Sequence, residues 1–295
     1  MKILYLSPID SNRGWGAESF LNQGFLELGH QTICLDYRAG RQELYRRMRQ
    51  AGEEGFDVLF LQRGENFPVE LVELVQRPRL FWDSELPARW GDHLHLFCSD
   101  AFEHYFLWTQ DILDELAQRN WIDAGKCSLL MGACHPPLHR PLPEVEKDLE
   151  AVFIGSLTQR RAALLENLST RFNITVVNAY GEDMVRYFNR AKVVLNLHAS
   201  DFPTVETRVC EALGCGAFLL TEKLAPGHPF TGGELVEFDG LDDLAEKLNH
   251  YLRNPEEREA IARKGLEAVL AGHTYRHRAQ RILEVMQTLL EGGAA

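Results

Sequence analysis

The sequence predicts an α/β protein with two parallel β-sheets, one in each half of the chain. Short apolar segments of strand length alternate with amphipathic helical segments in both halves, which is typical of parallel strands joined by right-handed crossovers. The chain has 295 residues, which is long for one hydrophobic core and ordinary for two domains. Between the halves, residues 134–150 contain four prolines, which indicate a linker. We therefore expect two domains, residues 1–145 and 146–295, with the last helix able to pack back on the first domain.

Six apolar segments are the strands expected in the first half. They are KILYLS (2–7), TICLDY (32–37), DVLFLQ (57–62), RLFWDS (79–84), LHLFCS (94–99) and CSLLMGA (127–133). Five more are expected in the second half: AVFIGS (151–156), ITVVNA (174–179), VVLNLH (193–198), AFLLTE (217–222) and LVEFDG (235–240). Two helices are expected in the carboxyl-terminal segment, separated by a break near Gly272. The first of them is expected to start at Pro255, because proline fits the first helical turn.

Composition limits the partners that the protein is expected to bind. The formal net charge is −12, whereas general affinity for nucleic acid or anionic lipid needs a cationic surface. The first apolar run is too short for a signal peptide, and no run of about 18 apolar residues could span a membrane. The six cysteines lack metal-binding spacing and mostly lie in apolar segments. We expect a soluble, cytoplasmic protein without a metal site.

Functional residues are expected in the loops that follow the strands, because open parallel sheets bind ligands at the carboxyl ends of their strands. After the predicted strand 193–198, a helix is expected to begin near Pro203 or Thr204 and to end at Gly214. Its amino terminus would then project over the edge of the sheet. Free N–H groups and a partial positive charge at that end favour phosphate.

One face of this predicted helix is polar. Its residues are Thr204, Arg208 and Glu211, beside a core face formed by Val205, Val209, Ala212 and Leu213. A surface ion pair between Arg208 and Glu211, contributing about 0.2–0.5 kcal/mol, is one explanation. A site for an anionic or polyhydroxylated ligand is the other, because a solvated face usually carries several charges and here the only further one is Glu206.

The loop after the first strand of the second half, FIGSLTQRRAALLENL (153–168), offers a second set of candidates. Gly155 lets the backbone approach a ligand, and Ser156 offers a hydroxyl group. Arg160 and Arg161 fall in the first helical turn, where the macrodipole disfavours cations. A bound anion would reverse that penalty, whereas the alternative is a solvated arginine pair.

Three further candidates have weaker sequence signals. Gly14, Trp15 and Gly16 precede a helix, but this GxG does not complete a dinucleotide fingerprint, so NAD is not expected. These glycines could still present backbone N–H groups to a pyrophosphate or a sugar. Asp83 lies just past a predicted strand and is a candidate general base or a capping residue. His198 ends its strand and is either a ligand contact or a structural histidine.

Several segments of the second half, taken in their order along the chain, resemble the CgeB-like glycosyltransferases, a branch of the group 1 family named for a spore-maturation protein. The matching segments are FIGSLTQRR (153–161), TRVCEALGCGAFLLTE (207–222), GELVEFDGLDDLAEKLNHYLRNPEEREAIARKG (233–265) and HTYRHRAQRIL (273–283). In the first half, LLMGACHPPLHRPL (129–142) resembles the segment that ends the family's amino-terminal domain. The resemblance implies a GT-B fold, in which two Rossmann-like domains face each other across a cleft. The second domain holds most of the nucleotide-sugar donor and the first holds the acceptor.

The resemblance also implies residue roles. Glu211 matches the glutamate that binds the ribose hydroxyls of the donor, and Arg208, Arg160 and Arg161 match positions near the diphosphate. The remaining expected donor contacts are Gly14, Trp15, Gly16, Gly155, Ser156, His198, Thr204 and Thr207. Many group 1 enzymes have a second glutamate eight residues before this one, where this chain has Pro203, so the donor sugar stays open.

The sequence therefore predicts a metal-independent glycosyltransferase that uses a nucleotide-sugar donor, most simply a UDP-sugar, and an unidentified acceptor. Arginines and helix N–H groups can stabilise a departing nucleoside diphosphate without a metal. No cofactor is expected, because the nucleotide sugar is a substrate. Two alternatives remain: a GT-B nucleotide-sugar epimerase, and a non-catalytic nucleotide-sugar-binding or coat-assembly protein.

Overall fold

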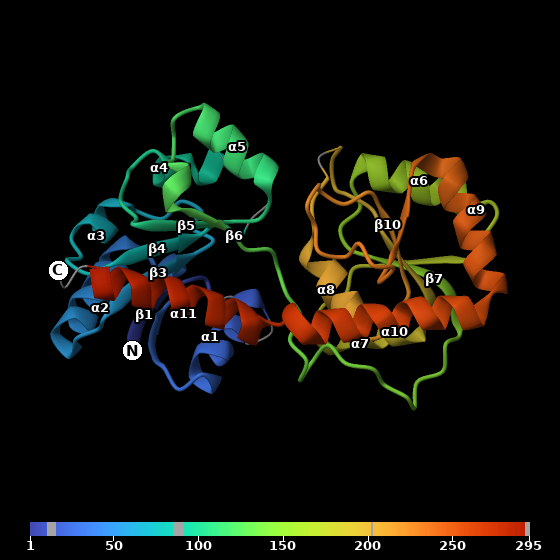
Figure 1. Cartoon of the computed structure of the whole chain (residues 1–295), viewed down its shortest axis with the longest axis horizontal. Helices are drawn as coiled ribbons and strands as arrows, with labels where there is room; N and C mark the ends of the chain where they lie inside the picture. The colour runs from blue at the N-terminus through green and yellow to red at the C-terminus, as the bar shows by residue number, and fades with distance from the viewer. Residues whose placement is uncertain (11–15, 85–90, 202, 293–295) are drawn as a thin grey trace. The chain divides into compact units, whose positions relative to one another are not determined.

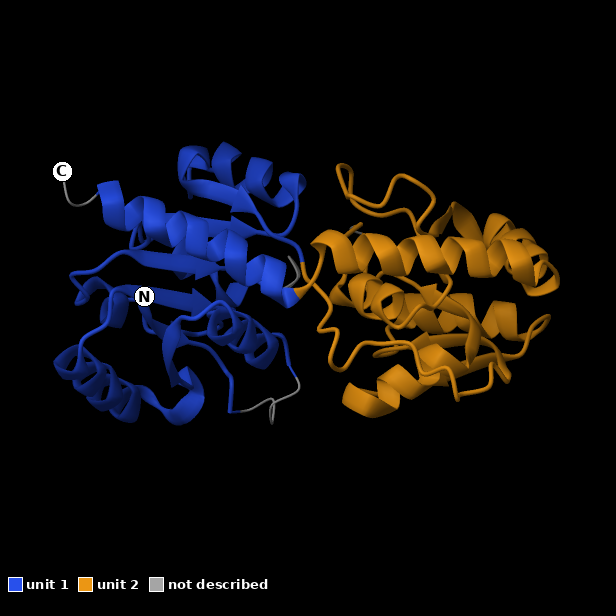
Figure 2. Ribbon diagram, turned by 60° about the horizontal axis from the view of Figure 1, so that its bottom comes forward, with its two compact units in different colours: residues 1–131, 275–295 blue, residues 132–274 orange. Residues whose placement is uncertain are grey.

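The computed structural model describes residues 1–10, 16–84, 91–201 and 203–292. The chain forms two compact units, coloured separately in Figure 2. Unit 1 contains residues 1–131 together with 275–295, and unit 2 contains residues 132–274. The predicted boundary between residues 145 and 146 falls inside unit 2, and the last helix, α11 (Tyr275–Gly292), belongs to unit 1.

Unit 1 is built on a parallel sheet whose strand order is β2-β1-β3-β4-β5-β6. The strands are β1 (Lys2–Leu6), β2 (Gln31–Leu35), β3 (Val58–Gln62), β4 (Arg79–Trp82), β5 (His104–Leu107) and β6 (Cys127–Leu129). The α-helices are α1 (Ala17–Glu27), α2 (Arg41–Glu54), α3 (Glu70–Glu73), α4 (Leu94–Phe97), α5 (Gln110–Gln118) and α11. Every residue of β3 is buried, as expected of a strand that is covered on both faces.

One predicted strand of unit 1 is wrong. Residues 94–99 form the short helix α4 (Leu94–Phe97) and a following turn instead of a strand, and the neighbour of β4 is β5. The consecutive residues Leu96 and Phe97 are both buried, which suits a helical turn and not the alternating faces of a strand. The error has a physical cause, because a short apolar run does not distinguish a strand from a buried helical turn.

The carboxyl-terminal helix packs against the first helix of the chain. Figure 1 shows α1 and α11 side by side. Gly24 of α1 permits this close packing, because a Cβ atom there would lie 3.0 Å from both the Cβ atom of Ala279 and the carbonyl oxygen of Tyr275. The rings of Phe20 and Tyr275 lie 5.6 Å apart in the same contact. Residues from the two ends of the sequence therefore share one core.

Unit 2 contains a second parallel sheet, with strand order β11-β10-β9-β7-β8. Its strands are β7 (Leu149–Ile154), β8 (Ile174–Val177), β9 (Ala191–Asn196), β10 (Leu219–Glu222) and β11 (Val236–Phe238). Its helices are α6 (Gln159–Ser169), α7 (Gly181–Arg190), α8 (Thr207–Gly214), α9 (Gly240–Arg253) and α10 (Pro255–Gly272). The five strands predicted for this half are confirmed, and so are the helix start at Pro255 and the helix end at Gly214.

The strand order identifies where each unit can bind a ligand. In unit 1 the order reverses at β1, which lies between β2 and β3, and in unit 2 it reverses at β7, which lies between β8 and β9. Ligands of open parallel sheets bind at the carboxyl ends of the strands beside such a reversal. In unit 2 these ends lead into Gly155 and into residues 197–206. Within the described ranges, no helix has the length and apolarity needed to cross a membrane.

Candidate functional site

The end of β7 supports an arginine from another element. The guanidinium group of Arg208, on α8, lies against Gly155, which has a backbone φ of +147°. A Cβ atom at Gly155 would lie 3.0 Å from Nη2 and 3.2 Å from Cζ of Arg208. A residue with a side chain at this position would displace the guanidinium group. Gly155 therefore permits the close approach of a side chain, whereas the sequence suggested a close approach of a ligand to the backbone.

Arg161 ties the loop after β7 to the loop after β9. Its Nε and Nη2 atoms donate to the carbonyl oxygen of Leu197 at 2.9 and 2.6 Å, and its Nη1 atom donates to the carbonyl oxygen of Ser156 at 3.1 Å. Its side chain is 5% exposed. Thr158 caps α6 by accepting a hydrogen bond from the backbone N–H of Arg161 at 3.3 Å. Arg161 thus holds the two loops together through their carbonyl oxygens, and the hydroxyl of Thr158 caps α6.

Glu206 joins Arg161 to Arg208. Its Oε1 atom lies 3.0 Å from Nη2 of Arg161, and its Oε2 atom lies 3.2 Å from Nη1 of Arg208. The ion pair that sequence alone suggested, between Arg208 and Glu211, does not form among the described residues. The explanation as a surface ion pair is therefore wrong, because the Arg208 side chain points toward the sheet edge and pairs with Glu206 instead.

Arg160 is also held by carboxylates of the protein. Its Nε atom lies 2.8 Å from Oδ1 of Asp201, and its Nη1 atom lies 3.0 Å from Oε2 of Glu222 at the end of β10. It also donates to the carbonyl oxygen of His198 at 3.3 Å, and the backbone N–H of His198 donates to Glu222. These carboxylates offset the penalty for a cation in the first turn of α6. The anion expected beside Arg160 is thus supplied by the chain itself.

Several polar atoms at this edge have no partner within the part of the chain that the structure describes. They are the Nε atom of Arg208, the Nδ1 atom of His198, the Oγ1 atom of Thr204 and the Oδ1 atom of Asn196. Their residues follow or end β9 or lie on α8, beside the reversal of strand order. The other ring nitrogen of His198, Nε2, lies 2.9 Å from the carbonyl oxygen of Lys223. Buried polar groups are almost always paired, so these unpaired atoms at the end of β9 and on α8 are candidate ligand contacts.

The helix start predicted near Pro203 or Thr204 is wrong, because α8 begins at Thr207. Thr204 and Val205 are both buried at 3% exposure, and the N-cap Glu206 has extended dihedral angles (φ −57°, ψ 148°). This irregular segment aims Glu206 at the two arginines, which a helical backbone would not do. Thr204 therefore contributes to the site from the loop and does not share a helix face with Arg208.

Glu211 lies one turn after Arg208 on α8, with its side chain 17% exposed. Burial raises the pKa of its carboxyl group to about 7, and the nearby charge of Arg208 only partly offsets this. Its Oε1 atom lies 3.9 Å from Nε2 of His139. Burial, and to a smaller extent the charge of His135, lowers the pKa of His139 to about 3. His139 is therefore neutral near pH 7, and Glu211 has no cationic partner at ion-pair distance among the described residues.

Two of the four candidates in unit 1, Asp83 and Gly16, lie within the described residues. Asp83 follows β4 as predicted, but its side chain is only 1% exposed, and its Oδ1 atom lies 3.0 Å from Nδ1 of the buried His93. Its role as a base remains a prediction. Gly16 is the N-cap of α1, whereas Gly14 and Trp15 lie outside the described residues.

Sequence reasoning missed three of the groups that shape these sites. In the sequence, Glu206 is only a further charge near the predicted helix, and Glu222 is only the last residue of a predicted strand. In unit 1, Arg63 follows β3 and lies 3.4 Å from Glu18, which is 2% exposed in the first turn of α1. The only available signal was position, since each of these residues ends a strand or opens a helix at a sheet edge.

Known proteins are similar to this chain in sequence and in fold. The glycosyl transferase-like family model matches residues 156–284. Spore protein CgeB of Bacillus subtilis is 29% identical over 106 residues, which is 32% of each chain, so this chain aligns with about a third of that curated relative.

Two solved structures match almost the whole chain. HepE of Anabaena, in complex with UDP and glucose, has a TM-score of 0.70 at 14% identity and covers 98% of this chain and 100% of its own. An alpha-glucosyltransferase in complex with UDP and a 13-mer DNA has a TM-score of 0.73 at 10% identity, over 97% of this chain and 99% of its own. At such identities the likeness shows the fold. The resemblance to the CgeB-like family is therefore confirmed, and the chain has the GT-B fold, with residues 156–284 matching the glycosyl transferase-like family model.

Proposed function

We propose that the protein is a glycosyltransferase whose unit 2 binds the diphosphate of a nucleotide-sugar donor at Arg208. One observation carries the proposal: the Arg208 guanidinium group lies against Gly155 beside the reversal of strand order, and its Nε atom has no partner in the described part of the chain. A free N–H donor on a charged, half-buried group suits a phosphate oxygen. The resemblance to group 1 enzymes supports the same role.

The amino terminus of α8 adds a second group of phosphate donors. No side chain of the described residues caps this helix, and its N-cap Glu206 directs its carboxylate to Arg161 and Arg208 instead. The first N–H groups of α8 are therefore available to an anion. Glu206 is a positioning residue in this scheme, because it would hold Arg208 without touching the donor.

Glu211 would accept hydrogen bonds from the ribose hydroxyls. Its carboxyl group lies one helical turn from Arg208, and its pKa of about 7 leaves it partly ionised near neutral pH. The spacing suits a nucleoside diphosphate, in which the ribose adjoins the phosphates. UDP is the proposed nucleotide, because both similar structures described above contain it.

In the reaction, an acceptor hydroxyl attacks the anomeric carbon of the sugar, and the bond from that carbon to the β-phosphate oxygen breaks. The departing diphosphate keeps the electron pair and gains negative charge. Arg208 and the α8 N–H groups would stabilise that charge, which is the main requirement of this step. We propose that they do so without a metal ion. Asp83, held by His93, is the proposed base for the acceptor proton.

Release of UDP from UDP-sugars tests this function. The protein is incubated with UDP-glucose and other UDP-sugars, with and without an acceptor mixture, in EDTA and in manganese. We expect slow release in water and faster release with an acceptor, unchanged by EDTA. Binding of UDP without any release would support the alternative of a non-catalytic binding or coat-assembly protein. Conversion of the donor into an epimer would support an epimerase.

A further inference from the structure

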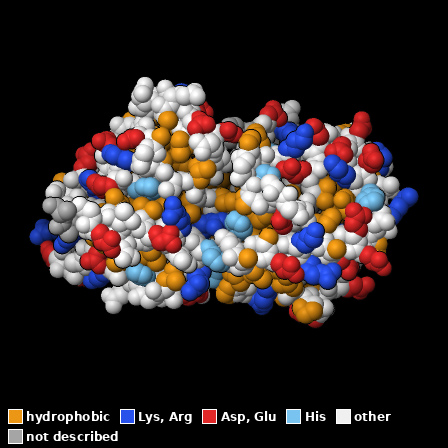
Figure 3. All heavy atoms as spheres, in the orientation of Figure 1, with side chains coloured by type: hydrophobic (Ala, Val, Ile, Leu, Met, Phe, Trp, Pro, Cys, Tyr) orange, Lys and Arg blue, Asp and Glu red, His pale blue; other side chains and the backbone are white. Residues whose placement is uncertain are grey.

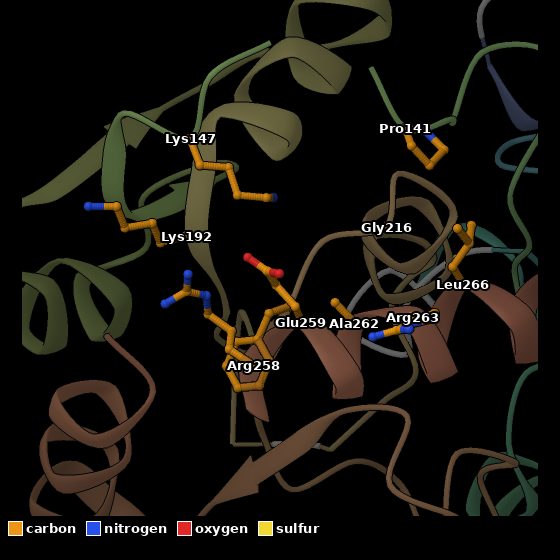
Figure 4. Close-up of a pocket in the computed structure, with 10 residues that line it drawn as sticks. Pro141, Lys147, Lys192, Gly216, Arg258, Glu259, Ala262, Arg263 and Leu266 are labelled. Carbon is orange, nitrogen blue, oxygen red and sulfur yellow. The ribbon is translucent and has the colours of Figure 1, made fainter. Parts of the chain in front are cut away.

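Unit 2 contains a pocket of about 240 Å³ that none of the donor-site residues lines. Five charged residues line it: Lys147, Lys192, Arg258, Glu259 and Arg263 (Figure 4). In Figure 4 the charged ends of Lys147 and Arg258 lie on either side of the Glu259 carboxylate. The ammonium group of Lys192 points away from Glu259.

The pocket lies at the opposite edge of the sheet from the donor site. Lys147 precedes β7, Lys192 is the second residue of β9, and Gly216 precedes β10. The donor-site residues instead follow the carboxyl ends of these strands. A strand with the six residues of β7 spans about 20 Å at roughly 3.3 Å per residue, so one small ligand cannot occupy both places.

The charge in this pocket is unbalanced. Four of the lining residues are cationic and one is a carboxylate, in a chain whose formal net charge is −12. None of the four makes an ion pair with a carboxylate of the described residues. Other basic residues of unit 2 do, including Arg160 and Arg190. Figure 3 shows acidic and basic side chains interspersed over the face it displays, so an excess of cations around one pocket is unusual for this protein.

Two of the cations have restricted access to water: Arg258 is buried and Lys147 is half-buried. Arg258 is 6% exposed, and its Nη1 atom donates to the carbonyl oxygen of Tyr251 at 2.7 Å. The Nζ atom of Lys147 donates to the carbonyl oxygen of Ala191 at 3.2 Å. Burial lowers the pKa of both groups, the charge of Arg258 lowers that of Lys147 further, and the charge of Glu259 opposes both shifts without reversing them. A buried charge costs several kcal/mol unless a counter-ion compensates it, so an anion between these groups would be stabilised.

We propose that this pocket binds a small anion of the phosphate-monoester class, at a site separate from the donor site. Lys147 and Arg258 would contact the phosphate oxygens. Glu259 would repel a bare anion, but it can accept a hydrogen bond from a P–OH group or from a neighbouring hydroxyl. The pocket therefore suits hydrogen phosphate or a phosphorylated polyol better than chloride or sulfate.

Calorimetric titration with inorganic phosphate at constant ionic strength tests the site. We expect wild type to bind phosphate, Lys147→Met to bind it at least tenfold more weakly, and Lys192→Met to stay within twofold. Lys192→Met is the matched control, because it removes an ammonium group that points away from Glu259. Arg208→Met controls for phosphate in the donor site and should leave this binding unchanged. The melting temperature of each variant is recorded, and Arg258→Met serves as a second probe of the pocket if it melts cooperatively.

Three outcomes would overturn the proposal. They are no phosphate binding by wild type at millimolar concentrations, unchanged affinity in Lys147→Met, and loss of affinity only in Arg208→Met. Flotation with vesicles of phosphatidic acid in phosphatidylcholine separates a soluble anion from a lipid headgroup. Vesicle binding that requires Lys147, without binding of free phosphate, would reject the soluble ligand.

Discussion

Replacing Gly155 by alanine tests how the protein positions Arg208. The new Cβ atom would lie 3.0 Å from Nη2 and 3.2 Å from Cζ of Arg208, so the guanidinium group must move. Losing one charge-assisted hydrogen bond to a phosphate costs about 1.5–3 kcal/mol, which corresponds to a roughly 10- to 150-fold weaker affinity for UDP. The alanine also adopts a backbone φ of +147°, which costs stability of the order of 1–3 kcal/mol.

A second glycine separates these two effects. Gly227 also has a positive φ, of +80°, but nothing lies within 4 Å of a Cβ atom placed there. Gly227→Ala should therefore lose stability without losing affinity for UDP. Calorimetric titration with UDP, together with thermal melting, measures both quantities in the two variants. An affinity of Gly155→Ala within twofold of wild type would refute the idea that Gly155 seats Arg208 for the diphosphate.

Three other predictions concern carboxylates, two in unit 2 and one in unit 1. Glu206→Gln breaks the buried ion pair with Arg161, which typically costs about 3–5 kcal/mol of stability. The melting temperature of unit 2 should therefore fall by several degrees. An unchanged melting temperature would show that Arg161 needs no counter-ion. Glu211 has a pKa of about 7 and must be ionised to accept hydrogen bonds from the ribose hydroxyls, so the affinity of wild type for UDP should fall roughly tenfold from pH 8 to pH 6. This fall is measured relative to Glu211→Gln, whose affinity should follow only the titration of the UDP phosphates. Parallel pH profiles of the two proteins would contradict this prediction. Asp83→Asn should lower turnover more than donor affinity, measured as UDP release and UDP binding, and unchanged turnover would make Asp83 a structural partner of His93.

The regular parts of unit 2 were predictable because local patterns determine them. Its five strands follow from short apolar runs, and the core face of α8 follows from helical spacing: Val209, Ala212 and Leu213 are all fully buried. Residues 94–99 of unit 1 show the limit of this signal, since a short apolar run fits a helical turn equally well. Periodicity therefore predicts core-facing elements better than it predicts short, irregular ones.

The contacts of the site were not predictable from sequence spacing. Arg208 and Glu211 stand three residues apart, but Arg208 pairs with Glu206, because residues 203–206 are not helical and Glu206 reaches the sheet edge from the N-cap of α8. The pairing of Arg160 with Glu222 joins residues that are far apart in the sequence and meet only when β10 lies beside β9. Choosing the counter-ion of a buried arginine needs this three-dimensional arrangement. A loop position indicates only that a charged residue lies near the ligand.

The most direct test of the donor site compares UDP with uridine. Both ligands are titrated by calorimetry into wild type, Arg208→Ala and Glu211→Ala, with thermal melting to verify that each variant is folded. If Arg208 binds the diphosphate and Glu211 the ribose, Arg208→Ala should weaken UDP at least tenfold and leave uridine nearly unchanged. Glu211→Ala should weaken both ligands by a similar factor of at least ten. Unaltered affinity for UDP in both folded variants would contradict the assignment of the donor site to this edge of unit 2.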